Sequence, residues 1–560
     1  MSAALQLLSS KMEKRTSLKN AAAIFFVCAT QTTIAQTFQW AKVIGDSLFS
    51  NGYRLNVDAA NNVYVAGFFD GVANFGNATL TSAGHWDILL AKYTPEGRPI
   101  WARRAGGGHY DTGEALAIDG SGENIFVAGF ISGRVSFEDT SITGYPFFIA
   151  NYNSEGNLKW VRTINALGGS APALAVDRTG NVYMSGSADV DHTVGPPLLK
   201  NRFFILKFNP SGEIVWIKGA SSSTGMAMDI TPVGIAVDRE GNTLITGTIQ
   251  NGTVWFDSTI ALTPIGETDI FVVKYDPAGN VIWVKQAGGP GLDVPNDITI
   301  DPSGDFYLTG SFGGTALFDR FTITSAGDQD FFLAKYEGGV PAWIKSAGGV
   351  DYDKGASVCI DPHGNVYATG NTSRASTFEA HTLPSGIFAV KYNSLGEFVW
   401  MAHATSTVAN SGILSFDLGI DGLQNVYLTG RFNGVATFGE LTLRSAGAES
   451  GFIAKLSNHK TMPTTNVQEK FSSRSFYLAQ NYPNPFNPTT TISYSIPALG
   501  FVTLKVFTLE VKEIQTLVSE FQQAGFYTVS FKAGNLPNGL YLYSLQIGSI
   551  SETQKMLLLK

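Results

Sequence analysis

The sequence predicts an all-β protein, and three observations lead to that prediction. Glycine accounts for 61 of the 560 residues, aromatic residues for 12% and charged residues for only 15%. Short β-branched and aromatic runs alternate with turns rich in Gly, Asn, Asp and Pro, which is typical of antiparallel strands. No segment keeps a helical hydrophobic period. The composition also excludes a disordered chain and a coiled coil.

The first 35 residues are expected to be a signal peptide. Four basic residues lie between Lys11 and Lys19, an apolar run of nine residues ends at Ala29, and small residues precede an expected cleavage before Gln36. The apolar run is too short for a membrane anchor, and no other segment of the chain has the length to span a bilayer. Met12 is an alternative start.

Cleavage removes four basic side chains and one acidic one, so the net charge changes from −8 to −11. An acidic chain lacks the basic face that phosphates require, which excludes a nucleic-acid partner. Cleavage also removes Cys28 and leaves Cys359 as the single cysteine, so no intramolecular disulfide is expected despite export.

Seven copies of one motif organise residues 36–456. Each copy has an aspartate, a Gly/Asn turn and an apolar strand, as in IDPSGDFYLTG, and each also has one tryptophan and one run such as DIFVVKY. These pieces predict four short strands per copy. The chain begins with a lone fourth strand at Trp40 and ends on the first three strands of the last copy. The first strand is therefore expected to complete the last sheet, which predicts a closed seven-bladed β-propeller and disfavours an open solenoid.

The aspartate of each motif is expected to be structural. An Asp side chain at this position hydrogen-bonds backbone two residues further on, and a catalytic role seldom needs seven copies. The predicted turn aspartates are Asp58, Asp119, Asp177, Asp238, Asp301, Asp361 and Asp421.

These repeats resemble the SBBP family of β-propeller repeats. Asp269 to Tyr275, Trp283, Gly288-Gly289, Asp293 and the segment ending at Gly310 follow that pattern closely. The resemblance implies the fold and leaves the ligand open.

Residues 457–476 are polar and are expected to form a linker. Residues 477–560 then read as short period-two strands separated by Pro, Gly and Asn, which predicts a small β-sandwich. The segment resembles the type A C-terminal sorting domains of type IX secretion substrates. The sorting motif is Asn481, Tyr482, Pro483, Asn484, Pro485, Phe486, Asn487 and Pro488. The resemblance implies export through the periplasm of a Gram-negative bacterium, with the type IX translocon and its sorting peptidase as partners. It further implies release or attachment at the cell surface.

No catalytic motif is present: the chain has no zinc-binding HExxH helix, no GxSxG elbow and no phosphate-binding loop. A ligand is therefore expected on the longer loops at one face of the ring, where residues break the repeat. The binding candidates are His109, Tyr110, Asp111, Asp293, Asp351, Tyr352 and Asp353, with Asp229 and Asp297 in the same class of loop. The aspartates either hold Ca²⁺ or cap the starts of strands; capping is favoured, and no metal or other cofactor is expected.

The function expected from these observations is a non-catalytic secreted or surface-bound module that binds an extracellular glycan or protein. The alternatives are an extracellular propeller enzyme, such as a polysaccharide lyase or hydrolase, and a passive surface scaffold.

Overall fold

The computed structural model is all-β, as the sequence predicts, and no helix occurs among the residues that it describes. The described part of the chain accordingly contains no helix able to cross a membrane. The described residues are 36–45, 49–76, 78–164, 166–190, 203–226, 229–408, 412–457, 477–478, 481, 484–496, 500–509, 512–523, 525–548 and 550–559. The expected signal peptide and nearly all of the expected linker lie outside these residues.

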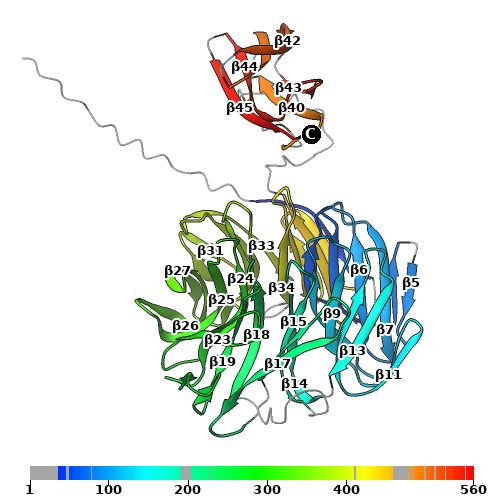
Figure 1. Cartoon of the computed structure of the whole chain (residues 1–560), viewed down its shortest axis with the longest axis vertical. Coiled ribbons are helices and arrows are strands. Elements are labelled where there is room, and N and C mark those ends of the chain that lie inside the picture. Colours follow the sequence, from blue (N-terminus) through cyan, green and yellow to red (C-terminus); the bar gives the residue numbers. More distant parts are fainter. Residues whose placement is uncertain are drawn as a thin grey trace, which may run out of the picture. The chain divides into compact units, whose positions relative to one another are not determined.

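The chain divides into two compact units, Met1–Thr461 and Met462–Lys560. In the described part of the first unit, seven antiparallel sheets are each built on four strands (Figure 1). The first strands are β2 (Phe49–Val57), β8 (Thr112–Ile118), β14 (Ala166–Val176), β18 (Ile230–Val237), β24 (Asp293–Ile300), β28 (Asp353–Ile360) and β34 (Ile413–Ile420). The second strands are β3 (Val63–Asp70), β9 (Ile125–Phe130), β15 (Val182–Val190), β19 (Thr243–Ile249), β25 (Phe306–Phe318), β29 (Val366–Thr372) and β35 (Val426–Phe432).

The remaining strands complete each sheet in the same order. The third strands are β6 (Asp87–Tyr93), β12 (Phe147–Tyr152), β16 (Phe203–Phe208), β22 (Asp269–Tyr275), β26 (Phe321–Glu337), β32 (Gly386–Tyr392) and β38 (Ser450–Leu456). The fourth strands are β7 (Pro99–Gly107), β13 (Leu158–Ile164), β17 (Ile214–Ser222), β23 (Val281–Ala287), β27 (Val340–Gly349), β33 (Phe398–Ser406) and, in the last sheet, β1 (Phe38–Val43).

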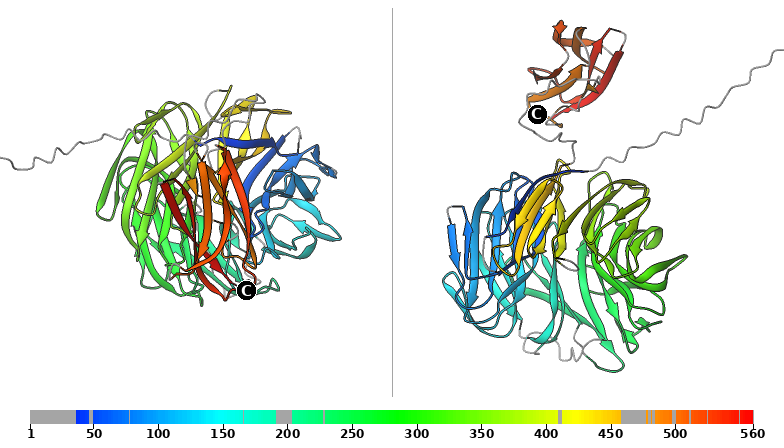
Figure 2. Two further views of the ribbon diagram at one scale, coloured as in Figure 1. Left: turned by 90° about the horizontal axis from the view of Figure 1, so that it is seen from above. Right: turned by 180° about the vertical axis from the view of Figure 1, so that it is seen from behind.

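The last sheet takes its fourth strand from the start of the chain. Strand β1 pairs antiparallel with β38, with Val43 opposite Phe452 and Ala41 opposite Ala454. Figure 2 shows the blue strands of the first sheet beside the yellow strands of the last. The pairing satisfies backbone groups of β38 that would otherwise form an open edge.

The first strands of neighbouring sheets also contact one another in a closed cycle. Strand β2 contacts β8, β8 contacts β14, and the sequence continues through β18, β24, β28 and β34 back to β2. These strands surround the centre of the unit, and the apolar clusters lie between adjacent sheets. One such cluster joins Tyr64 and Ile88 of the first sheet to Leu116 and Val127 of the second.

Five of the seven repeated tryptophans connect their sheet to the next by a hydrogen bond. The Trp101 indole N–H donates a hydrogen bond of 3.0 Å to the carbonyl of Ser154, which lies in the turn between the third and fourth strands of the following sheet. The same bond recurs for Trp40 with Pro95, Trp160 with Pro210, Trp216 with Pro277, and Trp343 with Ser394. These tryptophan side chains therefore provide both apolar contact surface and a directional hydrogen bond between sheets.

Short hairpins fill the outer spaces between sheets. They are β4 (Val72–Phe75) with β5 (Ala78–Thr81), β10 (Gly133–Phe137) with β11 (Thr140–Gly144), β20 (Val254–Trp255) with β21 (Ala261–Leu262), β30 (Ser376–Phe378) with β31 (His381–Leu383), and β36 (Val435–Phe438) with β37 (Leu441–Arg444). Four of them pair with the fourth strand of the preceding sheet. Their phenylalanines, such as Phe137 and Phe438, are fully buried there.

The second unit contains two sheets among its described residues. One orders β39 (Tyr477–Leu478), β40 (Thr489–Ile496) and β43 (Gly525–Lys532), and the other orders β42 (Glu513–Gln522), β41 (Gly500–Phe507), β44 (Gly539–Ile547) and β45 (Ile550–Leu558). Both sheets contribute to one core, in which Ile492, Leu504, Tyr543 and Met556 are buried.

Removal of β1 tests how much the first unit depends on its terminal strand. Deletion of residues 36–43 should lower the melting temperature by about 10 °C or more, since it uncovers the β38 edge and the apolar residues beneath β1. Deletion of Gln36 alone is the control. A synthetic peptide of residues 36–45 should restore part of the loss by strand addition. An unchanged melt in calorimetry would contradict the role of this pairing.

Candidate ligand-binding site

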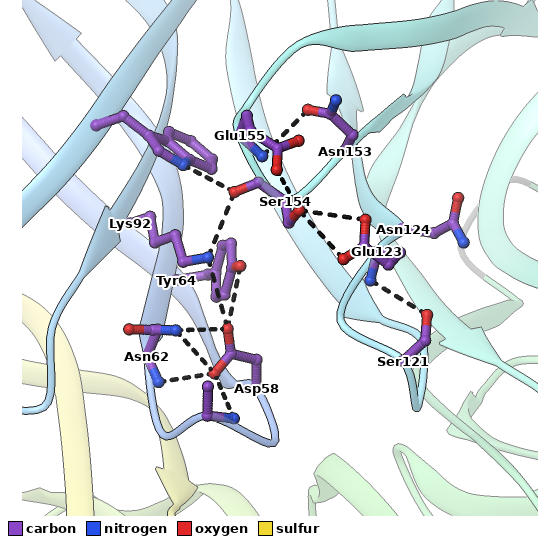
Figure 3. A network of polar contacts seen from close by, with 12 residues as sticks. Asp58, Asn62, Tyr64, Lys92, Ser121, Glu123, Asn124, Asn153, Ser154 and Glu155 are labelled. Atoms are coloured by element: carbon purple, nitrogen blue, oxygen red, sulfur yellow. Dashed lines mark hydrogen bonds and ion pairs between the residues drawn. The ribbon is translucent and has the colours of Figure 1, made fainter.

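The turn aspartates lie in one recurring hydrogen-bond network. Asp58 Oδ1 accepts a bond of 2.8 Å from the Asn62 N–H, and Asp58 Oδ2 accepts one of 3.2 Å from Tyr64 Oη (Figure 3). Lys92 Nζ lies 3.6 Å from Asp58 Oδ2 and donates to the carbonyl of Ser154 in the next sheet. The carboxylate is therefore occupied by its own turn and by a lysine that reaches the neighbouring sheet.

Asp111, Asp293 and Asp353 also bind backbone. Each is buried, and each accepts a hydrogen bond of 2.7–2.8 Å from the N–H of the glycine four residues earlier. Burial raises the pKa of each carboxyl to about 6, against the opposing effect of these hydrogen bonds. The three side chains hold the loops that precede their strands, and none of them lines a cavity described below.

The four other candidates lie at the surface. His109 and Tyr110 are exposed, and the Tyr110 ring stacks on His85 with ring centroids 4.6 Å apart. Asp351 pairs with Arg374 at 2.7 Å, and the Tyr352 ring lies beneath the Lys354 ammonium at 5.9 Å. Asp229, by contrast, is buried and accepts hydrogen bonds from Ser222 at the end of β17 and from Thr224 in the loop that follows. Over the described residues, no group of three or more His, Cys, Asp or Glu side chains has the placement to hold a metal ion.

The structure brings together a different set of residues at the centre of the strand cycle. A cavity of about 410 Å³, here called the aromatic cavity, is lined by Tyr53, Phe130 and Phe416 together with charged and polar side chains. Those side chains are Arg54, Glu114, Asn296, Lys354 and Ser415. Apolar surfaces combined with a few convergent polar groups are the usual lining of a ligand pocket.

Several polar groups of the aromatic cavity form no hydrogen bond or ion pair among the described residues, although the Lys354 ammonium lies over the Tyr352 ring at 5.9 Å. They are the Tyr53 hydroxyl, the Arg54 guanidinium and the Lys354 ammonium. Burial lowers the pKa of Lys354, and the neighbouring Arg431 lowers it further. Burial likewise raises the pKa of Glu114. The hydrogen bond from Thr112 and the positive charge of Arg54 oppose this increase. These groups are thus available to donate to or accept from a ligand.

A second cavity of about 190 Å³, here called the carboxylate cavity, adjoins the first and shares Arg54 with it. Asp297 and Asp417 face it from two different sheets, and Ser357 stands between them. Ser357 Oγ lies 2.8 Å from Asp297 Oδ2 and 2.7 Å from Asp417 Oδ1. One hydroxyl carries one proton, so both contacts become hydrogen bonds only when one carboxyl is protonated.

The two carboxyls also link neighbouring sheets. Asp297 Oδ2 accepts from the Val358 N–H at 2.9 Å, and Asp417 Oδ2 accepts from the Leu55 N–H at 2.8 Å. Burial raises the pKa of Asp297 to about 6, the Asp417 charge adds to that increase, and Arg54 opposes it. Burial also raises the pKa of Asp417, again against Arg54.

Sequence reasoning identified Asp297 and missed its partners. A β-bulge precedes the inward residue in the first strand of these sheets, between Gly52 and Arg54 and between Ser415 and Asp417. The bulge places two successive residues on the cavity side, so Tyr53 and Arg54 both line the aromatic cavity. Strict alternation of side chains along a strand would place only one of two successive residues, such as Tyr53 and Arg54, on the cavity side. The glycine or serine before each bulge is only a weak sequence signal that a bulge follows.

The raised pKa of Asp297 makes stability depend on pH. Its folded pKa of about 6 exceeds its value of 3.8 in the unfolded chain, so ionised Asp297 destabilises the fold above pH 6 and this cost disappears as the pH falls towards 4. Between pH 7.5 and 5 the wild type should therefore gain more unfolding free energy than Asp297→Asn. The full shift corresponds to about 3 kcal/mol, of which roughly half should be recovered between pH 7.5 and 5.

Urea unfolding of both proteins at each pH measures that difference. Asp257→Asn is the control, because Asp257 is exposed and hydrogen bonds from Thr259 and Ile260 hold its pKa below the usual range. Equal pH dependence of wild type and Asp297→Asn would contradict the assigned shift.

One known protein is similar to about half of this chain at low identity. An uncharacterised WD repeat-containing protein of Acanthamoeba polyphaga mimivirus is 27% identical over 319 residues, which cover 51% of this chain and 20% of that protein. The chain therefore matches only a fifth of that relative.

Two solved structures are similar at low identity. PorZ, an essential surface component of the type IX secretion system of Porphyromonas gingivalis, has 12% identity and a TM-score of 0.37, with 91% of this chain and 59% of PorZ covered. The polysaccharide lyase Uly1 has 9% identity and a TM-score of 0.38, with 75% of this chain and 99% of Uly1 covered. At these scores neither structure bears on what this chain binds.

Two family models match the sequence itself. The beta-propeller repeat model matches residues 282–311, and the secretion system C-terminal sorting domain model matches residues 480–559. In the second unit, Phe486 of the sorting motif is buried, its N–H donates to the Leu557 carbonyl at 2.9 Å, and Asn484 Oδ1 accepts from the Leu557 N–H at 2.8 Å. Tyr482 and Pro483 lie outside the described residues. The chain thus carries a beta-propeller repeat and a type IX secretion C-terminal sorting domain, and the sorting domain marks it for export to the cell surface or the extracellular space.

Proposed function

We propose that residues 36–456 form a seven-bladed β-propeller closed by β1 and that residues 477–560 form a β-sandwich sorting domain. The cycle of contacts among the seven first strands and the pairing of β1 with β38 support the first part. The shared core of two sheets supports the second. Residues 1–35 are the signal peptide and residues 457–476 the linker of this organisation.

The propeller is a non-catalytic module that binds an extracellular glycan at the aromatic cavity. The single observation that carries this proposal is the lining of that cavity, where aromatic rings stand beside Lys354 and the Tyr53 hydroxyl. Aromatic faces pack against the C–H faces of sugar rings, while the polar groups that lack partners hydrogen-bond to hydroxyls. A protein ligand at the same cavity is the second possibility for a binding module.

One observation favours an extracellular lyase or hydrolase as the alternative. Asp297 and Asp417 form a buried carboxyl pair with raised pKa values, which is a property of catalytic acids. Both carboxyls, however, accept hydrogen bonds from the backbone of the next sheet, which gives them a structural role. A general acid must instead reach the bond that it protonates.

A glycan array tests the binding function. The secreted protein should bind one class of immobilised glycan, and Phe416→Ala and Lys354→Met should each weaken that binding at least tenfold. Tyr145→Ala is the control, because Tyr145 is 66% exposed and lies outside the cavity. Binding that survives both cavity variants would contradict the assignment. Product release from the bound glycan that Asp297→Asn abolishes would establish the enzyme instead.

The sorting domain predicts a specific export defect. Deletion of residues 477–560 should leave the protein in the periplasm, where the translocon and its sorting peptidase no longer recognise it. Fractionation with an antibody to the propeller measures this result. A reporter fused to residues 457–560 behind a signal peptide should reach the surface. Surface display of the truncated protein would contradict the sorting role.

A further inference from the structure

We propose that the glycan is an unbranched polysaccharide chain that lies along a path of aromatic side chains from the loop surface to the aromatic cavity. The path consists of Tyr110, Trp86, Tyr53 and Phe416, with Phe68 beneath it. This inference rests on the proposed glycan-binding function and adds the form of the ligand.

Ring contacts run from Tyr110 to Phe416, and the buried Phe68 ring lies between Trp86 and Tyr53. The ring centroids of Tyr110 and Trp86 are 5.0 Å apart, those of Trp86 and Phe68 are 4.5 Å apart, and those of Phe68 and Tyr53 are 5.5 Å apart. Tyr53 then stacks on Phe416 at 5.3 Å, inside the cavity lining. Aromatic contacts therefore connect the exposed surface to the cavity, with the buried Phe68 ring as the link between Trp86 and Tyr53.

Exposure differs along the path in a way that suits a ligand. Tyr110 is 52% exposed, Trp86 and Tyr53 are partly exposed, and Phe68 is buried at 2%. Phe68 and Phe49 stack against Trp86 and hold its ring in position. Rings fixed by buried neighbours lose little conformational freedom when a ligand binds, which favours affinity.

The path breaks the repeat. In the strand registers, the position of Phe68 is taken by Phe130 in the second sheet. In the other five sheets it is taken by Ser187, Thr248, Ser311, Asn371 and Arg431. Trp86 lies two residues before Ile88, the partner of Phe68, and its counterpart in the second sheet is Tyr145. In the other sheets with a described counterpart, the residues are Thr268, Gln329, Ser385 and Glu449. Packing of the repeated sheets therefore does not require aromatic rings at these two positions. Aromatic residues occupy both positions only in the first and second sheets, and Phe130 of the second sheet itself lines the aromatic cavity, which favours a role in binding.

The chemistry of the path fits a sugar chain. Pyranose rings present C–H faces that pack on aromatic rings, and their hydroxyls form hydrogen bonds with polar side chains along the path. The Tyr53 hydroxyl and Lys354 ammonium lie at the cavity end, and His85 and His109 are exposed at the surface end. A chain several sugars long would contact both ends, whereas a single sugar would fill only the cavity.

The test is a length series measured by titration calorimetry on the secreted protein. The probes are unbranched di-, tetra- and hexasaccharides from cellulose, xylan, mannan and alginate. In the series that binds, the hexasaccharide should bind at least tenfold more tightly than the disaccharide. Tyr110→Ala and Trp86→Ala should remove that gain and leave disaccharide binding unchanged, while Phe416→Ala should weaken both.

Trp255→Ala and Tyr145→Ala are the matched controls, because these exposed aromatic side chains lie off the path. Melting temperatures show that each variant is folded, and Tyr110→Ala stands in if Trp86→Ala unfolds. A disaccharide that binds as tightly as the hexasaccharide, or a length gain that survives Tyr110→Ala, would overturn the chain-binding path and leave the binding function intact. Failure of every oligosaccharide to bind, with capture of a surface protein that Phe416→Ala abolishes, would overturn the glycan function together with the path.

Discussion

The pairing of β1 with β38 is the interaction on which the rest of the first unit depends. It places the start and the end of the unit in one sheet, and so brings β34 against β2. The backbone N–H of Leu55 reaches the Asp417 carboxylate across this junction, although the two residues are 362 positions apart. The Tyr53 and Phe416 rings stack across the same junction. Both cavities therefore exist only when the two ends of the repeat array meet.

The repeated residues and the exceptional residues have separate physical tasks. Aspartates such as Asp58 and tryptophans such as Trp101 make the same hydrogen bonds in sheet after sheet, and they set the spacing of the sheets. The residues that line the cavities differ between sheets at equivalent positions. The inward position after the bulge is Arg54, Asp297, Ser357 and Asp417 in four adjacent sheets, and Ala115 in the next sheet. The carboxylate cavity is the space between the charged side chains of Arg54, Asp297 and Asp417 and the small residues, such as Ala115, at the equivalent position of other sheets.

The sequence predicted the all-β class, the motif that repeats and the type IX export route well, because each of these depends on local patterns repeated several times or on one specific motif. The site was harder to predict. The notable loop aspartates, such as Asp111 and Asp353, bind their own loops. Tyr110 was identified because it breaks the repeat, but its contact with Trp86 depends on the packing of two loops. Arg54 and Asp417 face inward because of bulges, and a bulge shifts the side-chain alternation without any strong signal of its own.

The distance along the chain between β1 and its partner has a consequence for the order in which this protein matures. Strand β1 is the first element made after the expected signal peptide, and its partner is complete only once residue 456 has followed. Closing so long a loop is entropically costly and slow compared with forming a hairpin. The individual sheets are therefore expected to form before β1 pairs with β38, through an open intermediate with a free β38 edge. Such an intermediate must be protected from pairing with other chains until the amino terminus arrives.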